Sequence, residues 1–108
     1  MTAAKLAEQL HFTPIAVSEP DREVTGGYAG DLLSWVMGRA QSGDAWVTIM
    51  SNINVAAVAA LTDVSLVVLA ENVALDAGVA EQFEKRGLNI YSSPLPTFEL
   101  CAQIRALI

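Results

Sequence analysis

The feature of the sequence that most constrains the fold is an uninterrupted apolar run, VSLVVLA, at residues 64–70. A strand with one solvated face alternates apolar and polar residues. A central strand of a parallel sheet is covered on both faces and is apolar throughout. The run therefore predicts an interior strand of a parallel sheet, with helices above and below it.

Helix-like and strand-like segments alternate from residue 31 to the end of the chain. Further strands are predicted at 45–50 (AWVTIM) and 88–91 (LNIY), and further helices over 53–61, 76–86 and from Thr97 onward. Connections of about two to six residues between such segments are typical of βαβ units. The 108 residues contain no internal repeat or linker, so we predict one α/β domain over residues 1–108, with a mostly parallel sheet flanked by helices.

The first part of the chain is less regular. Thr2 is placed to cap a short helix, and residues 15–17 form a brief strand. Residues 23–25 extend before a glycine pair. Asp31 is placed to cap a second helix, for which Gly43 supplies a left-handed stop.

The charge pattern excludes two classes of partner. The formal net charge is -6, and the six basic residues form no run longer than two. Nucleic acids and anionic membrane surfaces are bound by clustered Lys and Arg, so neither is expected. The longest uncharged stretch, 45–62, is interrupted by the polar residues Ser51, Asn52 and Asn54 and is predicted to be a strand and a helix, without a membrane span.

The apolar content points to association. Hydrophobic residues make up 53% of the chain and the mean hydropathy is +0.40. A small domain cannot bury all of this surface, so we expect a homodimer or docking on a partner enzyme. Cys101 is the single cysteine, which permits no internal disulfide and suits a reducing compartment. Together with the absence of a signal-peptide pattern at the N-terminus, it predicts a cytoplasmic protein.

Residues 21–37 (DREVTGGYAGDLLSWVM) and 43–72 resemble the DRTGG domain family. The letters of that name occur in order as Asp21, Arg22, Thr25, Gly26 and Gly27, with Glu-Val interposed. The similarity covers nearly the whole chain. It implies a fold like the N-terminal domain of HPr kinase/phosphorylase and a regulatory or ligand-sensing role. Domains of this family also occur beside CBS domains and inside some phosphate acetyltransferases.

No catalytic constellation can be assembled from these residues. HPr kinase chemistry needs a P-loop of the form G-x-x-x-x-G-K-[ST], and the sequence has none. His11 is the only histidine, so neither a Ser-His-Asp set nor a histidine-based metal site is expected. We therefore predict a protein that is not an enzyme and carries no metal or cofactor.

Two interpretations of the glycine-rich stretch stay open. Glycines allow tight backbone geometry where a strand turns into a helix, and Asp31 merely caps. Alternatively, their exposed N–H groups cradle a small anion or a nucleotide, together with polar residues at the carboxyl ends of the strands. On the second interpretation the site residues are Thr25, Gly26, Gly27, Asp31, Ser51, Asn52 and Asn54. On the first, the Ser and Asn residues serve only as caps and turns.

Five further residues carry smaller expectations. Asp21 and Arg22 are predicted to form an ion pair that ties a loop to the body of the protein, with a place in a binding site as the alternative. Cys101 falls on an apolar stripe and is expected in the core. Trp35 and Trp46 could stack on a nucleotide base, but they are expected to anchor packing or an interface.

The sequence therefore predicts a non-catalytic regulatory or ligand-sensing domain. It would bind a small anionic ligand or nucleotide at the glycine-rich turn and act as a homodimer or on a partner enzyme. The alternative is a ligand-free assembly subunit of a larger complex, in which the glycines are structural.

Overall fold

The protein is a five-stranded sheet between two layers of helices. The computed structural model describes residues 1–108. The strands are β1 (Thr13–Val17), β2 (Gly26–Ala29), β3 (Asp44–Thr48), β4 (Leu66–Leu69) and β5 (Asn89–Ser92). The helices are α1 (Ala3–Leu10), α2 (Leu33–Arg39), α3 (Asn54–Thr62), α4 (Val79–Lys85) and α5 (Thr97–Leu107). The predicted α/β fold class is confirmed.

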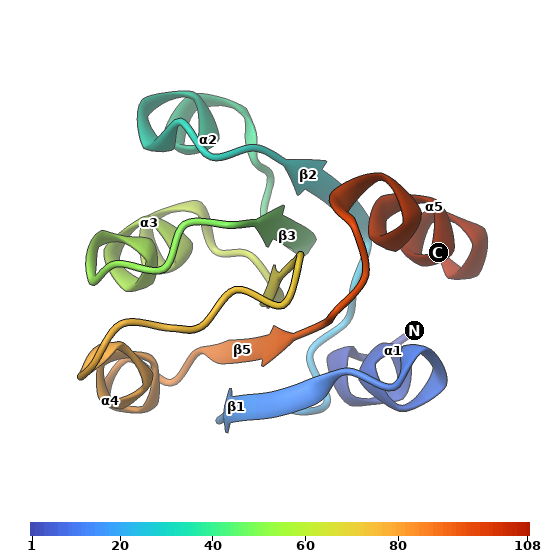
Figure 1. The fold of residues 1–108 in the computed structure, drawn as a ribbon, viewed down its shortest axis with the longest axis horizontal. Coiled ribbons are helices and arrows are strands. Elements are labelled where there is room, and N and C mark those ends of the chain that lie inside the picture. The colour runs from blue at the N-terminus through green and yellow to red at the C-terminus, as the bar shows by residue number, and fades with distance from the viewer.

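The order of the strands explains the layers. The sheet runs β1-β5-β4-β3-β2, with β2 to β5 parallel and β1 antiparallel to β5. Strands β2 to β5 are added in one direction, and right-handed crossovers then place every connecting helix on the same face. Helices α2, α3 and α4 accordingly cover one face, while α1 and α5 cover the other (Figure 1).

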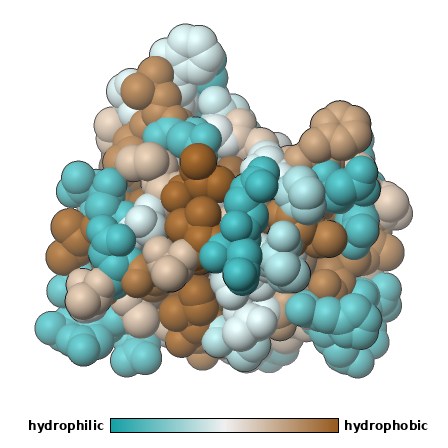
Figure 2. Space-filling view, in the orientation of Figure 1, coloured by the Kyte–Doolittle hydropathy of each residue, from teal (hydrophilic) through white to brown (hydrophobic).

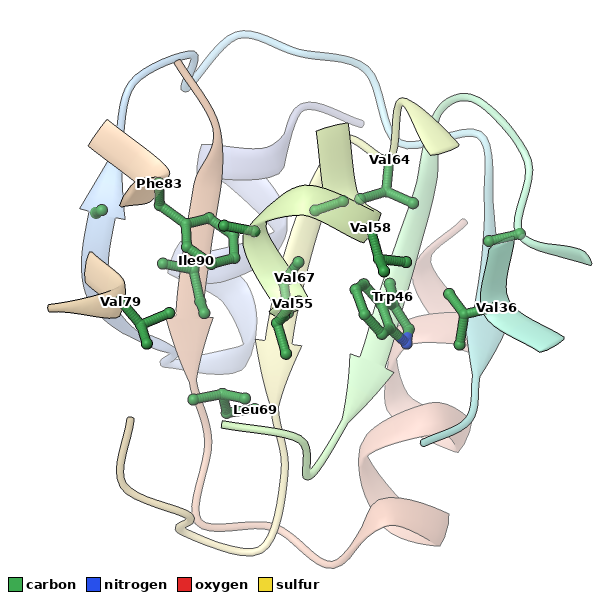
Figure 3. Packing of buried hydrophobic residues seen from close by; sticks show 14 residues of the cluster. Val36, Trp46, Val55, Val58, Val64, Val67, Leu69, Val79, Phe83 and Ile90 are labelled. Carbon is green, nitrogen blue, oxygen red and sulfur yellow. The ribbon is translucent and has the colours of Figure 1, made fainter. Parts of the chain in front are cut away.

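Each face of the sheet has its own hydrophobic core, and β4 contributes to both. Val67 and Leu69 pack among the side chains under α2, α3 and α4, together with Trp46 and Phe83 (Figure 3). The alternate residues of β4 pack under α1 and α5. All four residues of β4 are buried. The prediction of an interior strand covered on both faces is therefore confirmed.

Local signals account for several element ends. The hydroxyl of Thr2 accepts a hydrogen bond from the backbone N–H of Lys5 at 3.1 Å, as an N-cap does. His11 ends α1 in the left-handed conformation. The longest helix, α5, has 11 residues. None of the helices has the length and apolar character needed to cross a bilayer.

Asp31 does not cap α2, contrary to expectation. The helix begins at Leu33, and the residue before it makes no side-chain capping bond. Asp31 Oδ1 instead accepts from Thr48 Oγ1 at 2.8 Å and from the backbone N–H of Ile49 at 2.9 Å. Two donors at the end of β3 thus compete successfully for the carboxylate.

The glycines are also placed differently from the prediction. Gly26 and Gly27 are the first residues of β2, paired with Asp44 and Ala45, and do not form a turn from strand to helix. The extension expected before them is a single antiparallel bridge between Thr2 and Glu23. A strand forms here because the neighbouring β3 supplies a ladder of hydrogen bonds, which overrides the weak strand propensity of glycine.

Gly43 is left-handed as expected, with φ of 90°, but it does not end α2. The helix already ends at Arg39, and Gly43 turns the chain into β3. Helix α4 likewise begins at Val79, three residues after the predicted start at Asp76. The carboxylate of Asp76 is used elsewhere, in a bond with Ser51.

Candidate functional site

The structure divides the predicted site residues between the two ends of the strands, which are called here the amino edge and the carboxyl edge of the sheet. Thr25 and Gly26 lie at the amino end of β2, level with Asp44, the first residue of β3. Ser51 and Asn52 lie beyond Thr48, the last residue of β3. Four residues of strand separate the two levels, which is about 13 Å. The single shallow pocket expected from the sequence is therefore split, with Asp31 and Asn54 in the second group.

The second group belongs to the loops that follow β2, β3, β4 and β5, except for Asn54, which is the first residue of α3. These loops are called here the carboxyl-edge loops (residues 30–32, 49–53, 70–78 and 93–96). Their polar side chains mostly bind one another. Ser51 Oγ donates to Asp76 Oδ1 at 3.0 Å, and Asn52 Oδ1 accepts from the backbone N–H of Asn54 at 2.9 Å. Asp31 is held by the two donors described above. Of the four predicted residues here, only the Asn54 side chain makes no hydrogen bond.

The position where an open parallel sheet usually binds a ligand lies between β4 and β5. The chain after β4 passes to the face covered by α4, and the chain after β5 passes to the opposite face, covered by α5. In many folds such a divergence leaves a crevice between the two strands. In this protein the backbone N–H of Glu71 donates to Leu95 O at 2.9 Å, and that of Asn72 to Ser93 O at 3.1 Å. Glu71 and Asn72 are both left-handed. These bonds join the two loops and close the crevice.

Glu71 also fixes the start of α5. Its Oε2 accepts from the backbone N–H of Thr97 at 2.9 Å and from the hydroxyl of the same residue at 3.2 Å. A carboxylate at a helix N-terminus satisfies free N–H groups and complements the helix dipole. The cap of α5 thus comes from a loop 26 residues earlier.

At the amino edge, close packing explains two of the glycines. A Cβ on Gly26 would lie 2.8 Å from Asp44 Oδ1. The other oxygen of this carboxylate accepts from the backbone N–H of Gln41 at 2.8 Å. A Cβ on Gly43 would collide with the hydroxyl of Thr25, whose backbone N–H donates to Gly43 O. For Thr25 and Gly26 the structural interpretation is therefore sufficient.

The protein has one pocket, which lies between α5 and the strands β2 and β3 at one side of the sheet. We call it the α5–β2 groove. Its volume is about 330 Å³. The lining residues are Gly27, Tyr28, Ala29, Ala45, Val47, Cys101, Ile104, Arg105 and Ile108. The outline of the molecule is indented between α2 and α5, above β2 (Figures 1 and 2). Gly27 is the one predicted site residue in this groove.

Cys101 packs against the core under α1 and α5, but it is only partly buried and lies in the wall of this groove, so its predicted place in the core is confirmed only in part. Burial raises the pKa of its thiol above the ordinary value. The apolar stripe of α5 was correctly recognised in the sequence. That α5 crosses back over β2 and β3, leaving one side of the stripe open, is a tertiary feature with no local signal.

The predicted pairing of Asp21 with Arg22 is wrong. Arg22 pairs with Asp63 at 2.7 Å instead, and also donates to its backbone carbonyl. A hydrogen bond from Ser42 and the contacts with Arg22 lower the pKa of Asp63. His11 is exposed, and no group of three or more His, Cys, Asp or Glu side chains is arranged to hold a metal ion.

The two tryptophans have different surroundings. Trp46 is fully buried, and its Nε1 donates to Gly30 O at 3.0 Å. Trp35 is 53% exposed, with the Arg39 guanidinium 3.6 Å from the centre of its ring. Other large apolar side chains of α2 and of the loops after β2 and β3 are exposed as well. We call this set the apolar patch: Leu32, Trp35, Ile49 and Ile53. On the face that bears the carboxyl-edge loops, apolar side chains form a band between polar groups (Figure 2).

Comparison with known proteins supports the fold and leaves the family open. No protein-family model matches the chain, and no curated protein does. A crystal structure of the CBS and DRTGG domains of the regulatory region of Clostridium perfringens pyrophosphatase, complexed with the activator diadenosine tetraphosphate, superposes with a TM-score of 0.71. The fold is shared. The match has 13% sequence identity and covers 95% of this chain but only 45% of that one.

Proposed function

We propose that this chain is a non-catalytic regulatory domain of the DRTGG type, which senses a small anionic ligand, with nucleotides as the first class to test. In this proposal it resembles the N-terminal domain of HPr kinase/phosphorylase in fold only. It works in the cytoplasm, as a homodimer or on a partner enzyme.

The observation that carries the proposal is the fold likeness over 95% of the chain to a regulatory region whose structure contains a nucleotide activator. The sequence supports the same conclusion, because it lacks a P-loop and has a single histidine, His11. A ligand-sensing domain needs only a receiving surface and a state that the ligand favours.

Calorimetric titration of the purified chain with diadenosine tetraphosphate, ATP, AMP and a cyclic dinucleotide tests the proposal. We expect saturable binding of at least one of them, because the domain is proposed to respond to a nucleotide. NMR titration then shows which edge responds: the carboxyl-edge residues Asp31, Ser51, Asn52 and Asn54, the amino-edge pair Thr25 and Gly26, or the groove around Gly27. The absence of binding at millimolar concentration of all four compounds would contradict nucleotide sensing.

The homodimer is proposed to form through the apolar patch. Leu32 is 60% and Ile53 56% exposed, and large apolar side chains left exposed together mark interaction sites. Light scattering at micromolar concentration should give twice the chain mass, and Ile53→Glu should give a monomer. Leu61→Glu is the matched control, since Leu61 is 69% exposed but lies near the opposite end of α3. A wild-type monomer would remove the dimer from the proposal.

A second candidate is the ligand-free assembly subunit. It is favoured by the hydrogen bonds among Asp31, Thr48, Ser51 and Asp76, which leave few polar groups of the carboxyl-edge loops free for a ligand. This candidate predicts a stable complex with a partner protein and no response to any of the nucleotides above.

A further inference from the structure

Gly27 is a glycine for which the fold gives no reason. Gly26 and Gly43 are required by close contacts, and a Cβ on Gly30 would lie 2.9 Å from the ring of Tyr28. A Cβ on Gly27 would lie 3.5 Å from Ala45 O, an ordinary van der Waals distance, and the residue has no positive φ. Glycine weakens a strand, and it often marks a place where a ligand approaches the backbone.

The missing side chain of Gly27 keeps the α5–β2 groove open. Gly27 and Ala29 pair with Ala45 and Val47 in the parallel ladder, so all four belong to the face of the sheet that α5 covers. Three of them are glycine or alanine, and together they form a low floor. The volume of about 330 Å³ is at the small end of the range for pockets that hold small molecules.

Arg105 is the only residue with a charged side chain in the lining of the groove. It is exposed on α5, and no carboxylate lies within 4.0 Å of it, whereas Arg22 is paired with Asp63 and Arg39 is stacked on Trp35. The side chains of the other lining residues are uncharged. A guanidinium presents a rigid fork of donors that suits a carboxylate or a phosphate. In a chain with a net charge of -6, an unpaired arginine beside an apolar hollow offers a specific place for one anionic group.

We infer that the α5–β2 groove binds a small ligand with a flat apolar body and a single acidic group. The body lies on the floor formed by Gly27 and Ala29, and the acidic group is held by Arg105. This inference rests on the proposed function, that the domain senses a small ligand, and it specifies the site and the chemistry. Aromatic carboxylates and nucleoside monophosphates share this chemistry, so both are tested.

The primary experiment is an NMR titration of the full ¹⁵N-labelled chain with 1-naphthoate, with AMP and with the neutral analogue 1-naphthamide. We expect saturable shifts at Gly27, Ala29, Cys101 and Arg105 with 1-naphthoate or AMP. Because 1-naphthamide has the same aromatic body without the charge, we expect it to bind in the groove about tenfold more weakly.

Two variants separate the floor from the charge. Gly27→Val fills the groove and should abolish binding of all probes. Arg105→Gln should weaken 1-naphthoate and AMP about tenfold and leave 1-naphthamide unchanged. Arg86→Gln is the matched control, because Arg86 is also exposed without an ion partner but lies outside the groove. If Gly27→Val does not give a folded spectrum, Arg105→Gln still tests the inference.

Cys101 provides an independent readout, because its side chain lines the groove. Saturating 1-naphthoate should slow alkylation of the thiol by iodoacetamide several-fold in the wild-type chain and at most about twofold in Arg105→Gln at the same probe concentration. Equal alkylation rates with and without bound 1-naphthoate would contradict occupancy of the groove.

The outcomes separate this inference from the proposed function. If diadenosine tetraphosphate binds and shifts only the carboxyl-edge loops, the groove is the wrong site while ligand sensing stands. If 1-naphthoate binds the groove but no nucleotide binds, the site stands and nucleotide sensing is wrong. If the groove signals move with protein concentration alone, a second copy covers the groove and the inference is overturned. If no probe binds, both are wrong.

Discussion

The carboxyl-edge loops and the α5–β2 groove differ in how far the fold accounts for their residues. In the loops, Asp31, Ser51 and Glu71 each bind a partner from another segment of the chain. In the groove, Gly27 has room for a side chain and Arg105 has no ion partner. The loops carry the residue types that suggest a ligand site. It is in the groove, however, that a backbone position has free space and a charged side chain has no partner within the chain.

The difference shows that polar residue types are a weak guide to a binding site. Ser, Asn and Asp are favoured in caps and turns for the same reason that they bind ligands, namely short side chains with good hydrogen-bonding groups. A contact or a free space has to be seen before the two roles can be separated. Substituting a residue that makes contacts within the fold should lower the free energy of unfolding. Substituting a residue without such contacts should instead weaken ligand binding.

The largest effect is expected for Gly43→Ala. Gly43 has φ of 90°, and a Cβ there would collide with Thr25 Oγ1. The strained backbone should lower the free energy of unfolding by about 2 to 3 kcal/mol. Urea unfolding followed by circular dichroism measures this. A loss well below 1 kcal/mol would show that the turn before β3 relaxes and would weaken the structural account of this glycine.

Asp31→Ala should have the next largest effect. It removes the acceptor of Thr48 Oγ1 and of the Ile49 backbone N–H, and the loss of such bonds to a carboxylate is worth about 1.5 kcal/mol. Urea midpoints compare it with Asp21→Ala, because the side chain of Asp21 is exposed and makes no ion pair. Equal urea midpoints for the two variants would show that the hydrogen bonds of Asp31 do not stabilise the fold.

Glu71→Ala should cost less, about 1 kcal/mol, because it removes one exposed N-terminal cap from α5. Hydrogen exchange should show faster opening of the first turn of α5, with little change in α3. Glu84→Ala on α4 is the control, since Glu84 is exposed and forms no ion pair with a basic side chain. Unchanged exchange at Thr97 would mean that the carboxylate does not hold the helix.

The smallest effect on stability is expected for Gly27→Ala, and it has the opposite sign. A Cβ fits at this position, and replacing glycine restricts the unfolded chain, so the free energy of unfolding should rise by about 0.5 kcal/mol. The adjacent Gly26→Ala should lower it, because its Cβ would press on Asp44. A clear loss of stability in Gly27→Ala would show that the fold does require this glycine.

The fold was largely predictable because its strongest signals are local. The run at 64–70 became β4, and the alternation after residue 31 gave the order of β3, α3, β4, α4 and β5. The misplaced features depend on contacts between distant segments. Asp31 has a side chain that is favoured at helix N-caps, but it accepts a hydrogen bond from Thr48, 17 residues away. The glycine pair forms a strand only because it pairs with β3.

The candidate site was less predictable. From the sequence, Gly27 could not be told from Gly26, since they differ only in which face of the strand they occupy. The face is set by pairing with Asp44 and Ala45. The groove also depends on α5 crossing back over the first strands of the sheet, which no periodicity within residues 97–107 reveals.

The antiparallel pairing of β1 with β5 has a consequence for folding. Thr13 pairs with Ser92, so the sheet cannot complete its first edge until most of the chain is present. The strands from β2 to β5 instead join neighbours made shortly before them, and contacts close in sequence form faster. During synthesis β1 emerges well before β5, so β1 has no strand partner until β5 has left the ribosome. Strand β1 is thus expected to reach its native place only after β5 has formed.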